Sequence, residues 1–443
     1  MDHSCPVFFN SVRIIKILVI LLTNNLIFGS LNAQNKINSH ANKSYSPDIK
    51  TVLCYKKGWE LSDPVWELNS NEILQLTFDE LGNQAQTYQY TIIHCNADWE
   101  TSNLSDYEYI QGFADVQVKD YYYSFNTTYD YVHYVINFPN EDIAPKLSGN
   151  YIIRVYKDFD REQKILERRF YVVEPQVEIN AVVKRPGNTE FRNKGQEVDF
   201  QILHSGFRIR DPYADIRVNL IQNGRIDNII SNLKPRFIGN DELDYNYDYE
   251  NIFLGGNEFR YFDIKSMRYQ AEFIASIEFQ KPYYHVNLTQ AEDKAFKPYY
   301  FINDLNGRYY VDVQEGRDKN IEADYVYVHF SLPVDAPLVD EDVYVLGALT
   351  DWNLDESNKM TYNFDNYAYE ITLLLKQGYY NYMYAVVKKG ESKADLGYFE
   401  GNHYETENDY SIFVYYSDVT SRYQKLIGFY RTNTLSQGKT QNQ

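Results

Sequence analysis

Residues Tyr325–Phe330 read Tyr-Val-Tyr-Val-His-Phe, and this short stretch carries the pattern that decides the fold. Apolar Val326, Val328 and Phe330 alternate with ring-bearing polar residues. Successive side chains of a β-strand point to opposite faces, so this alternation is typical of a strand with one face in a core. The stretch therefore predicts a half-buried β-strand.

Runs with the same character recur along the whole chain, and glycine- or asparagine-containing turns separate many of them, as at 81–83 and 222–224. Long helical patterns are missing. This spacing predicts an all-β protein built from tandem antiparallel sandwiches. The further runs are Ile73–Phe78, Tyr88–Ile93, Val132–Phe138, Tyr151–Tyr156, Phe170–Val173, Val177–Val183, Val198–Leu203, Ile216–Ile221, Glu272–Phe279, Val343–Leu346, Tyr369–Leu375, Tyr380–Val387 and Ser411–Tyr416.

The composition is that of a folded, acidic protein. Of 443 residues, 44% are apolar and 24% are charged, which excludes a disordered chain. The mean hydropathy of -0.54 excludes a protein with many membrane spans. The formal charge of -19 disfavours nucleic acid and anionic lipid, because both repel a negative field. We therefore expect no nucleic-acid partner and no direct lipid insertion.

The first 33 residues have the features of an export signal. Arg13 and Lys16 precede the mostly apolar stretch Ile17–Phe28, and the small residue Ala33 follows. The apolar stretch is shorter than the ~20 residues that a membrane-spanning helix needs. We predict a signal peptide at 1–33 and an exported mature chain.

Two changes in composition divide the mature chain. Val173-Glu174-Pro175 ends one apolar run directly before another begins, and residues 317–323 are rich in charge. We predict three sandwich domains, at 46–175, 176–320 and 321–432. The polar tail at 433–443 is predicted to be disordered.

A search for catalytic motifs finds none of the common ones. The sequence has no G-x-S-x-G, H-E-x-x-H, C-x-x-C, P-loop or dinucleotide-binding pattern. His94 and Cys95 are neighbours, but neighbours on a strand face opposite ways, so they do not form a catalytic dyad. We expect no catalytic residue, no cofactor and no metal. A hydrolase with a scattered triad is a further alternative.

Cys54 and Cys95 are the two cysteines of the mature chain. In an oxidising compartment a disulfide between them would close a loop of about 40 residues and contribute on the order of 4 kcal/mol. The other interpretation is two free thiols that pack separately. The sequence leaves both open.

Alternating acidic or amide residues and tyrosines occupy 244–250. Asp244, Asn246 and Asp248 match the first ligands of a calcium-binding EF-hand loop, but the positions that need Gly and Glu hold Tyr249 and Gly255. An extended backbone with acids on one face and tyrosines on the other explains the pattern better. Tyrosine is favoured at protein interfaces. The candidate partner-binding residues are therefore Tyr245, Tyr247 and Tyr249.

The C-terminal third resembles another kind of module. Val343–Gly347, then Asp351-Trp352-Asn353, then Gly378–Tyr384 are similar to glycogen-binding modules, which are early-set sandwiches of immunoglobulin-like form. The resemblance implies that Trp352 stacks on sugar, with packing in the fold as the alternative role. A carbohydrate-binding protein of the cell envelope is therefore the alternative function.

Three longer motifs stand in order along the chain. The first motif is His94–Trp99 (His-Cys-Asn-Ala-Asp-Trp), the second is Asn251–Asp263, which contains Gly-Gly-Asn-Glu-Phe-Arg, and the third is Glu400–Tyr410, preceded by Leu374–Gly378. Together they resemble the plug family of the type IX secretion system. The resemblance implies a non-catalytic bacterial protein on the periplasmic side of the outer membrane. Such a protein occludes the periplasmic opening of the large β-barrel translocon when no substrate is engaged.

We expect the second motif to support structure rather than to contact a partner. Gly255-Gly256 breaks the strand pattern, and Gly256 is predicted to adopt a positive φ that side chains disfavour. Glu258 and Arg260 lie two residues apart, so they are expected to share a face and to pair there or with neighbouring strands.

Overall fold

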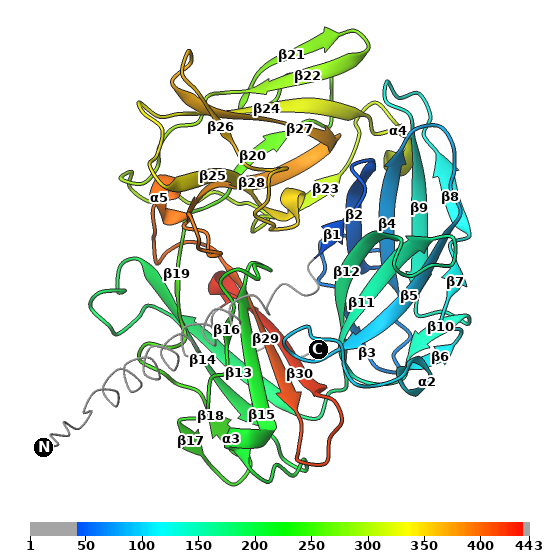
Figure 1. Ribbon diagram of the computed structural model, residues 1–443. Coiled ribbons are helices and arrows are strands. Elements are labelled where there is room, and N and C mark those ends of the chain that lie inside the picture. Colours follow the sequence, from blue (N-terminus) through cyan, green and yellow to red (C-terminus); the bar gives the residue numbers. More distant parts are fainter. Residues whose placement is uncertain (1–41, 437–443) are drawn as a thin grey trace, which may run out of the picture.

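The computed structural model describes residues 42–436, whose regular secondary structure consists almost entirely of strands (Figure 1). Strands make up 46% and helices 5%, so the predicted all-β fold is confirmed. The predicted signal peptide at 1–33 lies outside the described residues. Two-sheet sandwiches form three lobes, here named A, B and C, and each lobe has its own apolar core.

Lobe A comprises residues 42–174. One sheet has the order β1-β12-β11-β5-β7, with β3 parallel to β12, and the other has the order β2-β4-β9-β8. Tyr88, Tyr134 and Phe170 are among the aromatic residues of the core between them. The elements are β1 (Lys43–Ser44), β2 (Ile49–Lys56), β3 (Val65–Glu67), β4 (Leu74–Leu81), β5 (Tyr88–Cys95), α2 (Asp106–Tyr109), β6 (Ile110–Gly112), β7 (Val116–Gln117), β8 (Asp120–Tyr123), β9 (Tyr131–Phe138), β10 (Ile143–Pro145), β11 (Gly149–Lys157) and β12 (Lys164–Val173).

Lobe B is built from two separate parts of the chain, 176–254 and 404–436. Its sheets have the orders β13-β14-β18-β17, with β19 beside β14, and β16-β15-β29-β30. The elements are β13 (Glu178–Lys184), β14 (Gly195–Leu203), α3 (Pro212–Asp215), β15 (Ile216–Gln222), β16 (Ile230–Ser231), β17 (Phe237–Ile238), β18 (Glu242–Asp244), β19 (Ile252–Leu254), β29 (Asp409–Tyr416), β30 (Lys425–Asn433) and the 3-10 helix η2 (Thr434–Ser436).

Lobe C, residues 256–403, is an insertion into lobe B. Its sheets are formed by β20, β28, β23 and β25, and by β21-β22-β24-β27-β26. The elements are β20 (Arg260–Asp263), β21 (Ile274–Gln280), β22 (Tyr283–Leu288), β23 (Tyr309–Val311), α4 (Lys319–Glu322), β24 (Tyr325–Pro333), β25 (Glu341–Leu346), η1 (Ala348–Thr350), β26 (Thr361–Asn363), β27 (Ala368–Lys376), β28 (Gly378–Lys388) and α5 (Gly397–Glu400).

The insertion corrects the predicted domain ranges 176–320 and 321–432. β29 pairs with β15 over seven residues, from Ile216 opposite Tyr416 to Gln222 opposite Tyr410, and both strands contribute to one core. The sequence pattern identified both strands but not their partners, because pairing across such a distance leaves no local signal. The predicted disorder at 433–443 is also wrong at its start, since Asn433 ends β30 and 434–436 form η2; the rest lies outside the described residues.

The stretch Tyr325–Phe330 lies in β24 as predicted. Val326, Val328 and Phe330 are buried between the sheets of lobe C, while Tyr327 and His329 are half-exposed on the other face. Tyr325 departs from the alternation because lobe A covers it, and its hydroxyl donates to Asp79 of that lobe at 2.7 Å.

Candidate functional site

The first motif is a joint between lobes A and B. The Ala97 N–H donates to Gln424 Oε1 at 2.9 Å, and Asn219 Nδ2 donates to the Ala97 carbonyl at 3.0 Å. Trp99 is buried with a φ of +67°, and the guanidinium of Arg169 stacks 4.3 Å from its ring centre. The motif therefore holds β15 and the β29–β30 connection of lobe B against lobe A.

Within this joint His94 is structural. Burial lowers its pKa to about 4, so the imidazole is neutral at physiological pH, and its Nε2 lies 3.2 Å from the Ser148 carbonyl. Burial raises the pKa of Cys95 to about 12, which is the opposite of what a nucleophilic thiol requires. The pair has no property of a catalytic dyad.

The second and third motifs bind each other where the chain passes between lobes B and C. The His403 N–H and the Thr406 hydroxyl both donate to the Gly256 carbonyl, at 2.8 and 2.9 Å. Asn257 Nδ2 donates to the Glu400 carbonyl at 2.7 Å. Gly256 has the predicted positive φ, +65°. The two motifs therefore hold together the two chain segments that connect lobe C to lobe B; this pair of connections is termed the crossover below.

The side chains of the second motif pair with other segments rather than with each other. Arg260 Nε donates to Glu400 at 2.8 Å, and both side chains are at least nine-tenths buried. Glu258 accepts from the Tyr299 hydroxyl and, at 3.1 Å, from the Glu407 N–H. The expectation that Glu258 and Arg260 reach neighbouring segments is met, and their direct pairing is not observed.

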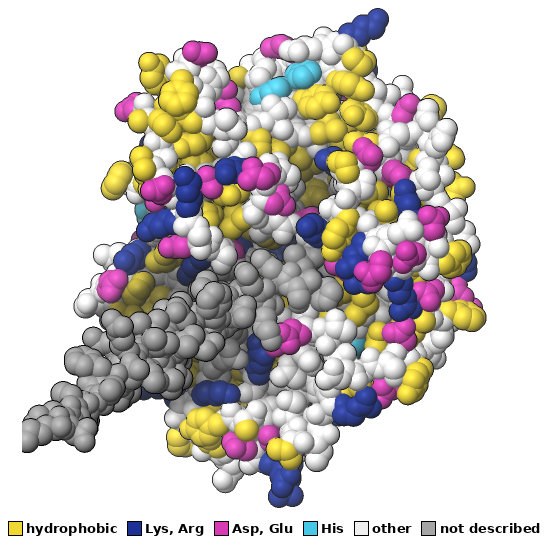
Figure 2. Space-filling view, viewed as in Figure 1, with side chains coloured by type: hydrophobic (Ala, Val, Ile, Leu, Met, Phe, Trp, Pro, Cys, Tyr) yellow, Lys and Arg dark blue, Asp and Glu magenta, His cyan; other side chains and the backbone are white. Residues whose placement is uncertain are grey.

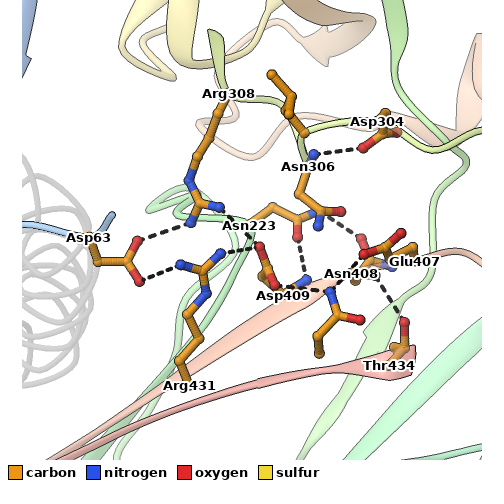
Figure 3. A network of polar contacts seen from close by, with 12 residues as sticks. Asp63, Asn223, Asp304, Asn306, Arg308, Glu407, Asn408, Asp409, Arg431 and Thr434 are labelled. Carbon is orange, nitrogen blue, oxygen red and sulfur yellow. Dashed lines mark hydrogen bonds and ion pairs between the residues drawn. The ribbon is translucent and has the colours of Figure 1, made fainter. Parts of the chain in front are cut away.

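A ring of four alternating charges joins all three lobes (Figure 3). Arg308 of lobe C and Arg431 of lobe B each contact both Asp63 of lobe A and Asp409 of lobe B. The distances are 3.0 Å from Arg308 to each carboxylate, and 3.3 and 2.5 Å from Arg431 to Asp63 and Asp409. This ring is termed the clasp below. Burial raises the pKa of Asp409, but the two arginines outweigh it and hold the pKa below its usual value.

A second polar joint connects lobes A and C and is more deeply buried. Lys376 Nζ lies 2.7 Å from Asp79 Oδ2, and each side chain is 1% exposed. Asp79 also accepts from Tyr325 and lies 2.6 Å from His133 Nδ1, and Lys376 donates to the Asn320 carbonyl at 2.8 Å. Such a pair is stable only when its members are mutually satisfied.

The sequence search missed both polar joints. Arg308 and Asp63 sit in loops where charge is expected. Lys376 directly follows the apolar run 373–375, which is a weak indication of burial, but a lysine at the end of a strand is ordinarily expected in solvent. What joins these residues is the packing of the three lobes, which no local pattern records.

The three candidate tyrosines do not form a common surface. Tyr245 is fully buried and stacks on Phe200 with ring centres 4.5 Å apart, so it is part of the lobe B core. Tyr247 is half-buried and donates to the Lys234 carbonyl, and only Tyr249 is exposed, at 51%. Prediction of Tyr245 as a partner-binding residue is wrong. Tyr245 is buried on the same side as Leu243, two residues before it, while Asn246 and Asp248 are exposed, so the tyrosine face of this stretch meets the core and the acidic face meets solvent.

Trp352 is partly buried and packs against a small apolar cluster of lobe C, close to lobe B. Its ring meets Phe259 edge to face with centres 6.0 Å apart, and a Cβ added at Gly307 would lie 2.5 Å from it. Its indole nitrogen comes within 3.9 Å of the position of a Cβ on Gly224 in lobe B. The packing role left open by the sequence therefore fits this residue.

Trp352→Ala should lower the free energy of unfolding by about 2 kcal/mol, because it empties part of this contact. Urea denaturation measures the change. Trp59→Ala is the matched control: Trp59 is 60% exposed, and its loss should cost less than about 0.5 kcal/mol. Equal effects of the two changes would contradict the packing role.

Cys54 and Cys95 are both free thiols. They lie in different sheets of lobe A, on β2 and β5, and burial raises the pKa of each to about 12. Of the two interpretations that the sequence left open, the structure therefore has the two free thiols. Cys54 packs against the core between the two sheets of lobe A, and Cys95 packs in a separate small cluster with Trp99 and Ile152.

Alkylation of the purified mature chain in denaturant without reductant should modify both Cys54 and Cys95. In the folded protein both should react slowly at pH 8, since the thiolate is scarce. Reductant should leave the melting temperature unchanged. A linked Cys54–Cys95 peptide in mass spectrometry of the unreduced protein would contradict this.

A cleft of about 750 Å³ lies between lobes B and C, next to Gly255 and Asn257. Its rim mixes cations such as Lys194 and Lys393 with acids such as Glu391. No group of three or more metal-ligating side chains occurs within 42–436. No helix of that part is long and apolar enough to cross a membrane.

Comparison with known proteins agrees with the motifs. The sequence profile "Type 9 secretion system plug protein 1st domain" matches residues 49–174, which correspond to lobe A. A crystal structure of a hypothetical protein from Parabacteroides merdae is 38% identical, covers 89% of this chain and 99% of its own, and has a TM-score of 0.86.

A serine-rich repeat adhesion glycoprotein from Streptococcus agalactiae is 10% identical over 88% of this chain and 97% of its own. Its TM-score of 0.13 is too low to indicate a shared fold. No curated protein matches the chain. With the first motif lying inside the matched region and the near-complete relative sharing the fold, the chain belongs to the plug protein family of the type IX secretion system.

Proposed function

We propose that this protein is a non-catalytic periplasmic plug, which binds the outer-membrane β-barrel translocon of the type IX secretion system and occludes its periplasmic opening at rest. The observation that carries the proposal is the family match over lobe A. Membership makes this a protein of that secretion system; the blocking role and the location at the inner face of the outer membrane are the proposed part.

The way the lobes are joined supports this role. A plug must resist deformation at the opening it closes. The clasp ties the three lobes at one point, while the Asp79–Lys376 pair and the two motif joints tie them in pairs. Buried, mutually satisfied polar networks favour one arrangement of the lobes over others.

Purification of the translocon from resting cells tests the proposal. The plug should co-purify with the barrel at a fixed ratio, and the ratio should fall when a secreted substrate is trapped in the channel. Cells that lack the plug should admit large hydrophilic dyes through the unoccupied translocon. Absence of the chain from the purified barrel, together with unchanged permeability, would refute the proposal.

A further inference from the structure

The strand β8 lies at the edge of the second sheet of lobe A. Among the described residues it pairs only with β9, and all four of its residues are exposed. It contains the run Tyr121-Tyr122-Tyr123, with exposed fractions of 44, 54 and 53%. Figure 2 shows apolar side chains elsewhere on the visible face in scattered groups among charges of both signs. On β8, by contrast, three exposed tyrosines follow one another along a single edge strand.

The direction of the β8 backbone follows from the hydrogen bonds just after it. The Ser124 N–H donates to the Tyr131 carbonyl on β9 at 2.9 Å. In an antiparallel ladder alternate residues point the same way, so the Tyr122 backbone also faces β9. The N–H and C=O groups of Tyr121 and Tyr123 therefore point outward, away from the sheet.

The same outward edge is already used two residues farther on. Phe125 shares the direction of Tyr121 and Tyr123, and its N–H donates to the Ile321 carbonyl of lobe C at 2.8 Å. The open part of the edge thus continues a line along which another segment of backbone already pairs.

β8 is short and begins with the charged Asp120, but it lacks three other features with which proteins protect an edge. It contains no proline or lysine, and its register with β9 runs without a bulge from Asp120 to Tyr123. Tyr121 and Tyr123 lie on one face with ring centres 6.0 Å apart, which offers an aromatic pair to a side chain beside them. Two outward donors and two outward acceptors in alternation fit an extended peptide backbone.

We propose that β8 is the docking edge of the plug, to which the translocon adds an extended segment. The segment hydrogen-bonds to the backbone of Tyr121 and Tyr123, and its side chains pack on the tyrosine rings. This inference rests on the proposed function and names the surface that performs it.

The test uses the mature chain and the translocon purified from cells that lack it. Tyr121→Lys/Tyr123→Lys places two charges along the edge, and Tyr123→Pro removes an outward N–H that no strand within 42–436 uses. Phe364→Lys/Tyr367→Lys is the control, since these side chains are 71 and 63% exposed in lobe C. Melting temperatures establish that each variant is folded.

We expect both edge variants to bind the translocon at least tenfold more weakly than the wild type, and the control to bind as the wild type does. Hydrogen exchange at residue resolution should show the amides of Tyr121 and Tyr123 slowing on binding, while that of Tyr122 is already protected. Undiminished binding by the edge variants overturns the docking edge and leaves the plug function standing. Failure of the wild type to bind overturns both. A dimer that pairs through β8 and excludes the translocon also overturns the proposal.

Discussion

Lys376→Met should lower the free energy of unfolding by about 3–5 kcal/mol, the cost of leaving a buried charge without its partner. Asp79 is 1% exposed and would keep its contacts with Tyr325 and His133 but lose the ammonium 2.7 Å away. Urea denaturation gives the change. Because the pair lies between lobes A and C, unfolding should also lose cooperativity, with lobe A separating first.

Two further variants distinguish the effect of breaking this buried pair from the effect of removing any lysine charge. Lys389→Met breaks the exposed pair with Asp340, whose side chains are 62 and 82% exposed, and should cost at most about 1 kcal/mol. Lys376→Met combined with Asp79→Leu removes both charges and should recover part of the loss. A double variant that is no more stable than Lys376→Met alone would show that the unpaired charge is not the cause of the loss.

The same pair predicts a dependence on pH. Burial raises the pKa of Asp79, but Lys376 and His133 outweigh it and hold the pKa below its usual value. A carboxyl with a depressed pKa in the folded state contributes stability that is present above about pH 4 and lost as the pH falls further. The wild type should therefore lose more stability than Lys376→Met between pH 5 and pH 3. Parallel pH profiles of the two proteins would contradict this assignment.

Gly255→Ala should destabilise the protein by about 3 kcal/mol or more, although it adds one methyl group. The new Cβ would lie 2.0 Å from the His403 carbonyl oxygen, and that oxygen is backbone, so no side-chain rotation relieves the collision. The Gly255 N–H also donates to the Lys194 carbonyl at 2.8 Å, which fixes the chain from the other side. The variant should open the crossover between the second and third motifs.

Two other glycines serve as controls for this collision. Gly256→Val keeps free space around the new side chain but forces it to a φ of +65°, which should cost about 1–2 kcal/mol. Gly187→Ala has neither a close neighbour nor a positive φ and should change stability by less than about 0.5 kcal/mol. Circular dichroism melts of the three variants should rank in this order. A silent Gly255→Ala would mean that the crossover tolerates a shift of its backbone.

The sequence located the important segments of this protein better than it assigned their roles. The first and second motifs were identified from their residues, and both prove to be joints between lobes. These segments have distinctive sequences because their geometry limits which residues fit. Trp99 lies in a buried turn, and Gly255 is in close contact with the backbone of His403.

The tyrosine candidates fail for a related reason. Alternation separates the two faces of a strand but does not say which face meets the core, and Tyr245 lies on the buried side with Leu243, stacked on Phe200. The stretch 121–123 of β8 also contains three tyrosines, as many as the stretch 245–249. Only the edge position of that strand distinguishes them.

By itself the sequence determined the all-β class, the strand positions and the family, because alternation and turns are local and the motifs are contiguous. Tertiary structure alone decided that lobe C interrupts lobe B, that Asp79 meets Lys376 across 297 residues, and that the clasp gathers one charge from each of four distant segments. The physical reason is that strand pairing and burial of charge depend on which surfaces meet. A β-strand carries the same backbone donors and acceptors whatever its partner, so its own residues specify its faces but not its neighbour.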